Sequence, residues 1–305
     1  MRDIVIGVQD FRKTYGDSVA VNGISFDVMR SEIFGLLGPN GAGKTTTLES
    51  LEGLRVPDSG SLLVSGIDPA RAPRKLRNLI GVQLQSSGLP ETITPDEALR
   101  LFCAYHDRKP PSGLLERLGL AEKRKDQFYQ LSTGQQRRLA LALAVAHEPR
   151  VLFLDEPTAG LDVATRVELH NLMRQLQSKG TTIILATHDM AEAEEMSDRV
   201  AIMLRGNIVD IGTPMEITAT GAGLTKISVS TQSASLNDPD LVLPAVNQRT
   251  IKDEYTIFFS TDIGRTVSAI IAQIDSEGDL LIDLRVERPS LEDRFLEITT
   301  AGGDK

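Results

Sequence analysis

The chain has few of the features that mark secreted or membrane-spanning proteins. It holds one cysteine, Cys103, in 305 residues, so an internal disulfide is impossible and a reducing compartment is expected. Cys103 lies in an apolar helical pattern, which favours a core position over a nucleophile. The longest apolar-rich run, residues 139–146, is far shorter than the roughly 18 residues that a membrane span needs. The N-terminus reads as a strand and not as a signal peptide. We therefore expect no membrane crossing, so that any action at a membrane requires docking onto another chain.

Basic residues are also fewer than acidic residues. Lys and Arg number 33 against 42 Asp and Glu, which gives a formal net charge of −9. A nucleic-acid-binding protein usually carries a basic face, so this charge balance argues against nucleic-acid binding. It does not exclude a local basic patch. With 41% hydrophobic and 25% charged residues, the composition is that of an ordinary globular protein. The length predicts roughly two domains, at about 150 residues each.

The most informative stretch is the glycine-rich segment 38–46, GPNGAGKTT. It fits the pattern G-x-x-x-x-G-K-[ST], with Gly38, Gly43, Lys44 and Thr45 at the fixed positions. Apolar residues 33–37 before it predict a buried strand, and residues 45–54 after it predict a helix. The alternative is a glycine turn that binds nothing. Because the segment lies between a strand and a helix start, we expect its backbone amides to surround a phosphate chain.

Chemically active side chains follow two further apolar runs. Residues 151–154 predict a central parallel strand, with Asp155 and Glu156 at its carboxyl end. Residues 182–187 predict a second buried strand, which His188 follows. Ligands bind at this edge of open α/β sheets, and adjacent carboxylates there need a cation or a proton-transfer role. Magnesium beside a triphosphate meets that need, whereas the alternative is a solvated acidic turn. The other three histidines, His106, His147 and His170, are expected to be packing or surface residues.

The remaining patterns describe the surroundings of this core. Two early strand-like segments predict a small antiparallel sheet, and Tyr15 between them either stacks on an adenine ring or packs on its own sheet. Capping-box spacings begin helices after Thr94 and after Ser132, with residues 95–125 expected to be helical except at Pro110 and Pro111. The glycines near residue 222 read as a linker to a small α+β domain with no cluster of chemical residues. The expected domains are 1–220 and 224–305, and the expected two-residue hairpin turn is Gly206-Asn207.

Five motifs then stand in a fixed order: residues 38–45, Gln85, LSTGQ at residues 131–135, LFLDEP at residues 152–157, and His188. This arrangement resembles the nucleotide-binding subunit of ATP-binding-cassette (ABC) transporters over residues 4–217. The resemblance implies a P-loop NTPase core with an antiparallel β subdomain, a helical subdomain at about residues 90–145, and the small C-terminal α+β domain. The segment PSLEDRFLEI near the C-terminus resembles the drug- and natural-product-exporter branch, of the daunorubicin-resistance (ABC-2) type.

The resemblance also implies the ATP-binding residues. It assigns contacts with ATP to Tyr15, Gly38, Pro39, Asn40, Gly41, Ala42, Gly43, Lys44, Thr45 and Thr46. Tyr15 resembles the aromatic residue that stacks on adenine. Ser132, Gly134 and Gln135 would bind the γ-phosphate of an ATP molecule held by a second copy of the chain, and Asp162 would lie at the dimer contact. Thr133 departs from the family's usual glycine, and its Cβ is expected to strain a close backbone approach.

The catalytic and metal-binding residues follow in the same way. Glu156 would act as general base, with His188 and Gln85 as the other catalytic residues. Thr45, Gln85 and Asp155 would hold Mg²⁺. Gln83 is the alternative to Gln85, since it lies two residues away and the register of the motif leaves both open.

As a whole, the resemblance implies an ATPase that hydrolyses ATP with Mg²⁺ as cofactor. A homodimer, a separate transmembrane permease and a peripheral position at the cytoplasmic face of the membrane are expected, with no nucleic acid bound. One rival is a soluble non-transport ABC ATPase acting on ribosomes or DNA, and another is a regulatory subunit that binds ATP without hydrolysis. The single cassette and the acidic balance argue against the first rival, and the presence of Glu156 and His188 argues against the second. The transported molecule is not encoded here, because its pocket would lie in another chain.

Overall fold

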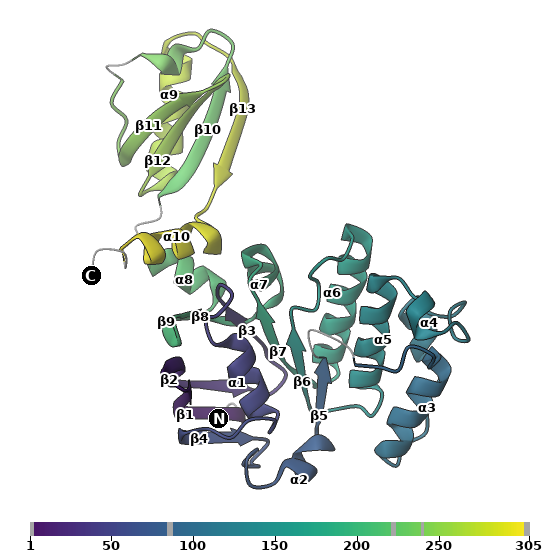
Figure 1. Cartoon of the computed structure of the whole chain (residues 1–305). Coiled ribbons are helices and arrows are strands. Elements are labelled where there is room, and N and C mark those ends of the chain that lie inside the picture. The colour runs from purple at the N-terminus through teal and green to yellow at the C-terminus, as the bar shows by residue number, and fades with distance from the viewer. Residues whose placement is uncertain (1–2, 84–87, 221–223, 239–240, 302–305) are drawn as a thin grey trace. The chain divides into compact units, whose positions relative to one another are not determined.

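The computed structural model of the chain describes residues 3–83, 88–220, 224–238 and 241–301 (Figure 1). The chain divides into two compact units, Met1–Pro214 and Met215–Lys305. The sequence places the end of the first domain at residue 220. The structure instead groups residues 215–220 with the second unit.

A six-stranded sheet forms the centre of the first unit, in the order β5-β6-β7-β3-β8-β9. The bounds are β3 (Ile33–Leu37), β5 (Ile80–Gln83), β6 (Val151–Asp155), β7 (Thr182–Thr187), β8 (Arg199–Leu204) and β9 (Asn207–Gly212). The first five strands in that order are parallel, and β9 is antiparallel to β8. Every residue of β3, β6 and β7 is buried, which explains their uniformly apolar sequences. Their carboxyl ends meet at one edge of the sheet.

Helices connect these parallel strands, as crossover connections require. In the first unit they are α1 (Lys44–Leu51), α2 (Pro73–Arg77), α6 (Val163–Ser178) and α7 (Met190–Met196). The expected α/β class with a parallel central sheet is therefore confirmed. None of the described helices combines the length and the apolar character that crossing a bilayer requires.

A second sheet of the first unit confirms the predicted antiparallel subdomain. It has the order β2-β1-β4, with β1 (Ile4–Tyr15), β2 (Ser18–Met29) and β4 (Ser59–Val64). One hydrophobic cluster joins it to the central sheet, and within that cluster the rings of Phe26 and Phe34 stack at 5.1 Å between centroids. The sheet thus holds the end of β1, and with it Tyr15, in a fixed position beside the start of α1.

The helical region contains α3 (Pro95–Tyr105), α4 (Leu114–Arg117), the 3₁₀ turn η1 (Phe128–Gln130) and α5 (Thr133–Val145). Both predicted capping boxes are confirmed, at Thr94 and at Ser132. The predicted break at Pro110 and Pro111 is present, but it is longer than expected, since α3 ends at Tyr105 and α4 begins at Leu114. Asp107 and Gly113 have left-handed backbones with φ of 52° and 71°, and the prolines between them cannot continue a helix. The prediction of helix is therefore wrong for residues 106–109, 112–113 and 118–125.

The β8–β9 hairpin differs from expectation by one residue. Arg205 and Gly206 form the turn with φ of 48° and 79°, and Asn207 begins β9. A two-residue hairpin turn of this type needs positive φ at both central positions, so Arg205 adopts a conformation that asparagine or glycine usually supplies.

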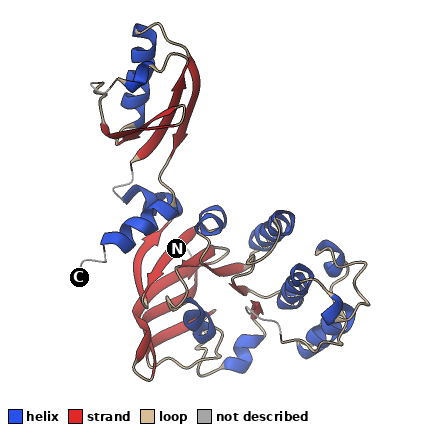
Figure 2. Cartoon of the chain, turned by 45° about the horizontal axis from the view of Figure 1, so that its top comes forward, coloured by secondary structure: helices blue, strands red, loops and turns tan. Residues whose placement is uncertain are grey.

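The second unit is built on a four-stranded antiparallel sheet in the order β11-β12-β10-β13. The elements are α8 (Pro214–Thr220), β10 (Thr225–Thr231), β11 (Val246–Lys252), β12 (Tyr255–Ser260), α9 (Ile263–Ser276), β13 (Leu281–Glu287) and α10 (Leu291–Ala301), with the 3₁₀ turn η2 (Ser235–Asn237). Helix α9 covers one face of the sheet, and Ile270 and Ile274 enter its core (Figure 2). Strand β11 was not predicted, because this mostly exposed edge strand lacks apolar alternation.

Candidate functional site

The segment between β3 and α1 lines a cavity of about 440 Å³ in the first unit. Asn40 to Thr46 contribute to its wall, together with residues at the ends of β1 and β6. The backbone there has no room for larger residues: a Cβ on Gly38 would lie 2.3 Å from the Met203 carbonyl oxygen. A Cβ on Gly43, where φ is 105°, would lie 2.5 Å from the Ala20 carbonyl oxygen. These two glycines let the loop turn tightly into the N-terminus of α1, where backbone amides favour an anion.

Lys44 begins α1 and is almost fully buried. Its Nζ donates hydrogen bonds to the carbonyl oxygens of Gly38 at 2.7 Å and Pro39 at 3.3 Å, and lies 3.7 Å from Glu156 Oε1. Burial lowers the pKa of Lys44, while Glu156 and Asp155 oppose that effect. The loop's own carbonyls thus hold the ammonium group beside two acidic side chains.

Thr45 and Asp155 meet across the base of the loop. The Thr45 hydroxyl donates to Asp155 Oδ2 at 3.0 Å, and Asp155 Oδ1 is buried without a hydrogen bond. Burial raises the pKa of Asp155, with Glu156 as an additional repulsive charge. Hydroxyl and carboxylate oxygens are the ligands that Mg²⁺ prefers. This orphaned carboxylate oxygen fits a small divalent cation.

Glu156 follows β6 with a left-handed backbone, φ 50°. Its Oε2 accepts a hydrogen bond at 2.7 Å from His188 Nδ1, and its buried Oε1 has no hydrogen bond. His188 follows β7, and 55% of its side chain is exposed. The parallel sheet therefore brings together two predicted residues that are 32 positions apart, and leaves one carboxylate oxygen for a further partner.

No sequence pattern marks Arg137, which reaches this site from α5. Its Nη1 donates to the Glu156 carbonyl oxygen at 2.7 Å. A left-handed backbone costs a residue with a side chain roughly 1–2 kcal/mol, so the bond from Arg137 helps to hold Glu156 in place. From the sequence alone, Arg137 looks like a solvent-facing arginine of an amphipathic helix. Its bond to the Glu156 carbonyl oxygen depends on how α5 packs against the end of β6, which the sequence does not show.

Tyr15 is the last residue of β1 and lies at the rim of the same cavity, with 41% of its surface exposed. Lys13 Nζ and Arg55 Cζ lie 5.6 Å and 5.3 Å from its ring centroid. The sequence left open whether the ring stacks on a base or packs on its own sheet. An exposed ring beside the loop favours stacking.

The three signature residues Ser132, Gly134 and Gln135 lie at the N-terminus of α5, and none of them lines the cavity around the loop. Ser132 and Gln135 instead cap the helix reciprocally. Thr133 is the first helical residue and is exposed. Asp162, expected at a dimer contact, caps α6 by accepting from the Thr165 amide. The signature segment is therefore a second surface, separate from the loop.

The predicted residue Gln85 lies outside the described residues. Gln83, the alternative, ends β5 and is 4% exposed, and its Oε1 has no hydrogen bond. Its side chain thus ends in a buried polar position beside β6.

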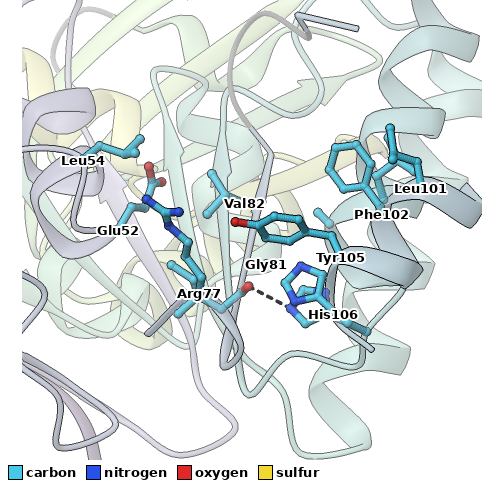
Figure 3. A pocket seen from close by; sticks show the side chains of 13 residues that line it. Glu52, Leu54, Arg77, Gly81, Val82, Leu101, Phe102, Tyr105 and His106 are labelled. Carbon is cyan, nitrogen blue, oxygen red and sulfur yellow. Dashed lines mark hydrogen bonds between the residues drawn. The ribbon is translucent and has the colours of Figure 1, made fainter. Parts of the chain in front are cut away.

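A larger cavity of about 510 Å³ lies between the end of α1, strand β5 and helix α3 (Figure 3). We call it the apolar groove. Its rim carries Leu54, Leu101, Phe102 and Tyr105, which are 57%, 59%, 37% and 69% exposed. On its floor the rings of His106 and His147 stack at 4.0 Å between centroids. No sequence pattern predicts this surface, because it combines residues from four separate segments.

Comparison with known proteins gives consistent matches. A family model described as ABC transporter matches residues 21–159. The linearmycin resistance ATP-binding protein LnrL of Bacillus subtilis (strain 168) is 33% identical, over 97% of this chain and 98% of that protein. The daunorubicin resistance ATP-binding protein DrrA3 of Streptomyces coeruleorubidus is 35% identical, over 98% of this chain and 97% of that protein.

Solved structures give the same result for the fold. The structure of an ATP-binding subunit of an ABC transporter is similar with a TM-score of 0.67 and 28% identity, over 70% of this chain and 92% of that one. A dimeric ATP-binding cassette in a post-hydrolysis state, bound to ADP and Pi, is similar with a TM-score of 0.62 and 27% identity. That match covers 68% of this chain and 98% of the other.

Proposed function

Because the chain belongs to the ABC transporter family as an ATP-binding subunit that hydrolyses ATP, and to the family's drug- and natural-product-exporter branch, we propose that it powers a separate membrane permease. The observation that carries the proposal is the meeting of the phosphate loop, Asp155, Glu156 and His188 at one sheet edge. A single chain supplies only one wall of that site, since the signature segment lies elsewhere.

Each residue of this site has a distinct role in ATP hydrolysis. The loop amides and Lys44 bind the phosphate chain, and Tyr15 stacks on the adenine ring. Glu156 accepts a proton from the attacking water through Oε1, which has no hydrogen bond among the described residues, while His188 and Arg137 fix its side chain and backbone. Thr45 and Asp155 fit Mg²⁺, which when bound supplies neutralising charge to the phosphates.

The second wall comes from another copy of the chain. The exposed N-terminus of α5, with Ser132, Gly134 and Gln135, suits the γ-phosphate of ATP held by the first copy. ATP then binds the closed homodimer better than the open one, so ATP favours closure. Hydrolysis replaces the triphosphate with two separate products and weakens this preference. The cycle of closing and opening is the motion that drives the permease.

The permease docks in the apolar groove, and the chain sits peripherally at the cytoplasmic face of the membrane. Large exposed apolar side chains gathered around a concave surface mark an interaction site. The groove lies between α3 of the helical region and β5 and the end of α1 in the nucleotide-binding core. A partner docked there would therefore move when the helical region moves relative to the core. We infer that exported drugs or natural products are bound by the permease and not by this chain.

The test is co-purification from membranes of the source cell with the Tyr105→Ser variant. We expect the wild-type chain to bring down a polytopic membrane protein, and Tyr105→Ser to lose most of it while ATP binding is kept. Tyr129→Ser is the matched control, because Tyr129 is also exposed, at 58%, but does not line the groove. Recovery of ribosomes or DNA in place of a membrane protein would contradict the proposal.

A further inference from the structure

Glu52 is a buried acid in the apolar groove that the ATPase site does not use. It forms the C-cap of α1, is 5% exposed and lines the groove beside Leu54 and Arg77 (Figure 3). Its Oε2 is buried and has no hydrogen bond. Across the described residues, Glu52 takes part in no ion pair within 4.0 Å, and Arg77 forms none with it.

Three features of this position disfavour a carboxylate. Burial is the largest, and the nearby acids Glu49 and Asp155 add to it, which together raise the pKa of Glu52 to about 8. The third is the helix itself: the last turn of α1 contains no basic residue, and the negative end of its dipole repels an acid. A cation placed against the carboxylate opposes all three effects, because its attraction favours the charged form.

Such a local conflict between residue and environment is typical of a functional position. Glutamine would fill the same volume without the charge, so packing alone does not account for an acid here. The groove is open and its rim is apolar, so a partner's side chain can reach Glu52 while its neighbours contact Leu54, Leu101 and Tyr105. The occupant that fits both features has apolar residues around one basic side chain.

We propose that Glu52 binds a lysine or arginine side chain on an otherwise apolar cytoplasmic segment of the membrane partner. The inference rests on the proposed function, because it names the chemistry of the segment that docks in the groove. A segment that lacks the basic residue forms no ion pair and covers the neutral acid without giving it a hydrogen-bond partner, so the groove favours segments that carry the basic residue. Glu52 therefore selects the permease, and the apolar rim supplies affinity.

The test uses two synthetic amphipathic helical peptides with leucine and phenylalanine on one face. One carries a single central arginine, and the other carries citrulline, its neutral isostere, at the same place. Binding to the full chain is measured by calorimetry. We expect the arginine peptide to bind about 10-fold more tightly, as a charged hydrogen bond implies. Glu52→Gln should remove this difference and leave binding of the citrulline peptide unchanged.

Controls separate Glu52 from the general negative charge of the chain. Glu148→Gln removes one exposed acid outside the groove and should keep the preference for arginine. Arg77→Gln should keep it as well, because Arg77 does not pair with Glu52. Unchanged ATP binding by each variant shows that the fold is intact.

The outcomes distinguish this inference from the function on which it rests. Equal binding of both peptides to the wild-type chain, or a preference that survives in Glu52→Gln, overturns the role of Glu52 but leaves the groove as a docking surface. Binding of neither peptide overturns the groove as a docking surface and the role of Glu52 with it. In that case co-purification of a membrane protein would still support the transport function through another surface.

Discussion

At the scale of single residues, Glu156 shows how the backbone prepares a side chain for chemistry. Its φ of 50° is unfavourable for a residue with a Cβ, and bonds from His188 and Arg137 hold it there. The strained position directs one oxygen to His188. The other, Oε1, lies 3.7 Å from Lys44 Nζ and has no hydrogen bond among the described residues. This oxygen can accept a hydrogen bond from a water molecule, as the proposed general base requires.

Replacing Glu156 by glutamine tests that role. We expect Glu156→Gln to bind ATP normally and to lose at least about 100-fold in turnover, the usual contribution of a general base. The variant should also accumulate as an ATP-bound dimer, since hydrolysis no longer opens it. ATP binding, phosphate release and gel filtration measure the three effects.

Glu148 supplies a matched control for that experiment. It is an exposed acid that also has a left-handed backbone, φ 57°, and lies outside the cavity around the loop. Glu148→Gln should hydrolyse ATP at the wild-type rate. Turnover by Glu156→Gln that matched this control would remove Glu156 from the role of base.

Arg137 is a positioning residue, because it acts on ATP through the backbone of Glu156. Arg137→Gln should lower kcat by about 10-fold, the effect of losing one charged hydrogen bond, with little change in KM for ATP. Arg137→Lys should restore part of kcat, because it keeps a cationic donor. A rise in KM with unchanged kcat would instead indicate a role in holding the nucleotide.

At the scale of elements, α1 and α5 connect the ATP site to the rest of the first unit. Helix α1 begins at Lys44 in the phosphate loop and is capped by Glu52 in the apolar groove. Helix α5 begins within the signature segment and ends at Val145, two residues before the buried His147, and its last turn lines the groove. In the proposed dimer, a nucleotide at the loop would contact α1 of its own chain and α5 of the other copy. A partner docked in the groove would contact the opposite ends of both helices, which is the physical basis for coupling the two sites.

His147 fixes the segment after α5 to β5, and its protonation should destabilise the fold, because the charged ring would be buried beside His106. Its Nε2 bonds to the Ile80 carbonyl oxygen at 2.9 Å, and burial, aided by His106, lowers the pKa of His147 to about 4 from 6.5. Between pH 6.5 and 4 the unfolded chain binds more protons than the folded one, so stability falls as the pH falls. We expect a loss of roughly 2 kcal/mol from pH 6.5 to pH 5.

Urea unfolding at the two pH values measures that loss. His147→Gln keeps a donor for Ile80 without a titrating ring, and its free energy of unfolding should change less with pH than that of the wild-type chain. Equal pH dependence in the two proteins would show that His147 is not the group that destabilises the fold in acid.

The sequence predicted best those elements whose signal is local. The buried strands β3, β6 and β7 are uniformly apolar, and the caps at Thr94 and Ser132 depend on residues three positions apart. It failed for the edge strand β11 and for the helix expected after Tyr105, where pattern is weak or backbone geometry dominates. Arg137 and Glu52 could not be found from sequence, because their importance arises from contacts between distant segments.

At the scale of the whole molecule, the central proposal is a catalytic site divided between two chains. The cavity around the loop holds Lys44, Asp155 and Glu156, while Ser132 at the start of α5 lies outside it. Two copies related by a two-fold axis would each complete the other's site. The second unit, with its own sheet and core, contributes none of these residues.

The most direct test of the divided site mixes two inactive variants, Lys44→Ala and Ser132→Ala. Each variant alone should hydrolyse ATP only slightly, because both sites of its dimer lack the same side chain, either Lys44 or Ser132. In an equimolar mixture, half of the dimers pair the two variants and each has one intact site, so about a quarter of the wild-type rate should return. A mixture as inactive as its components, or a Ser132→Ala chain with full activity at any protein concentration, would contradict the account.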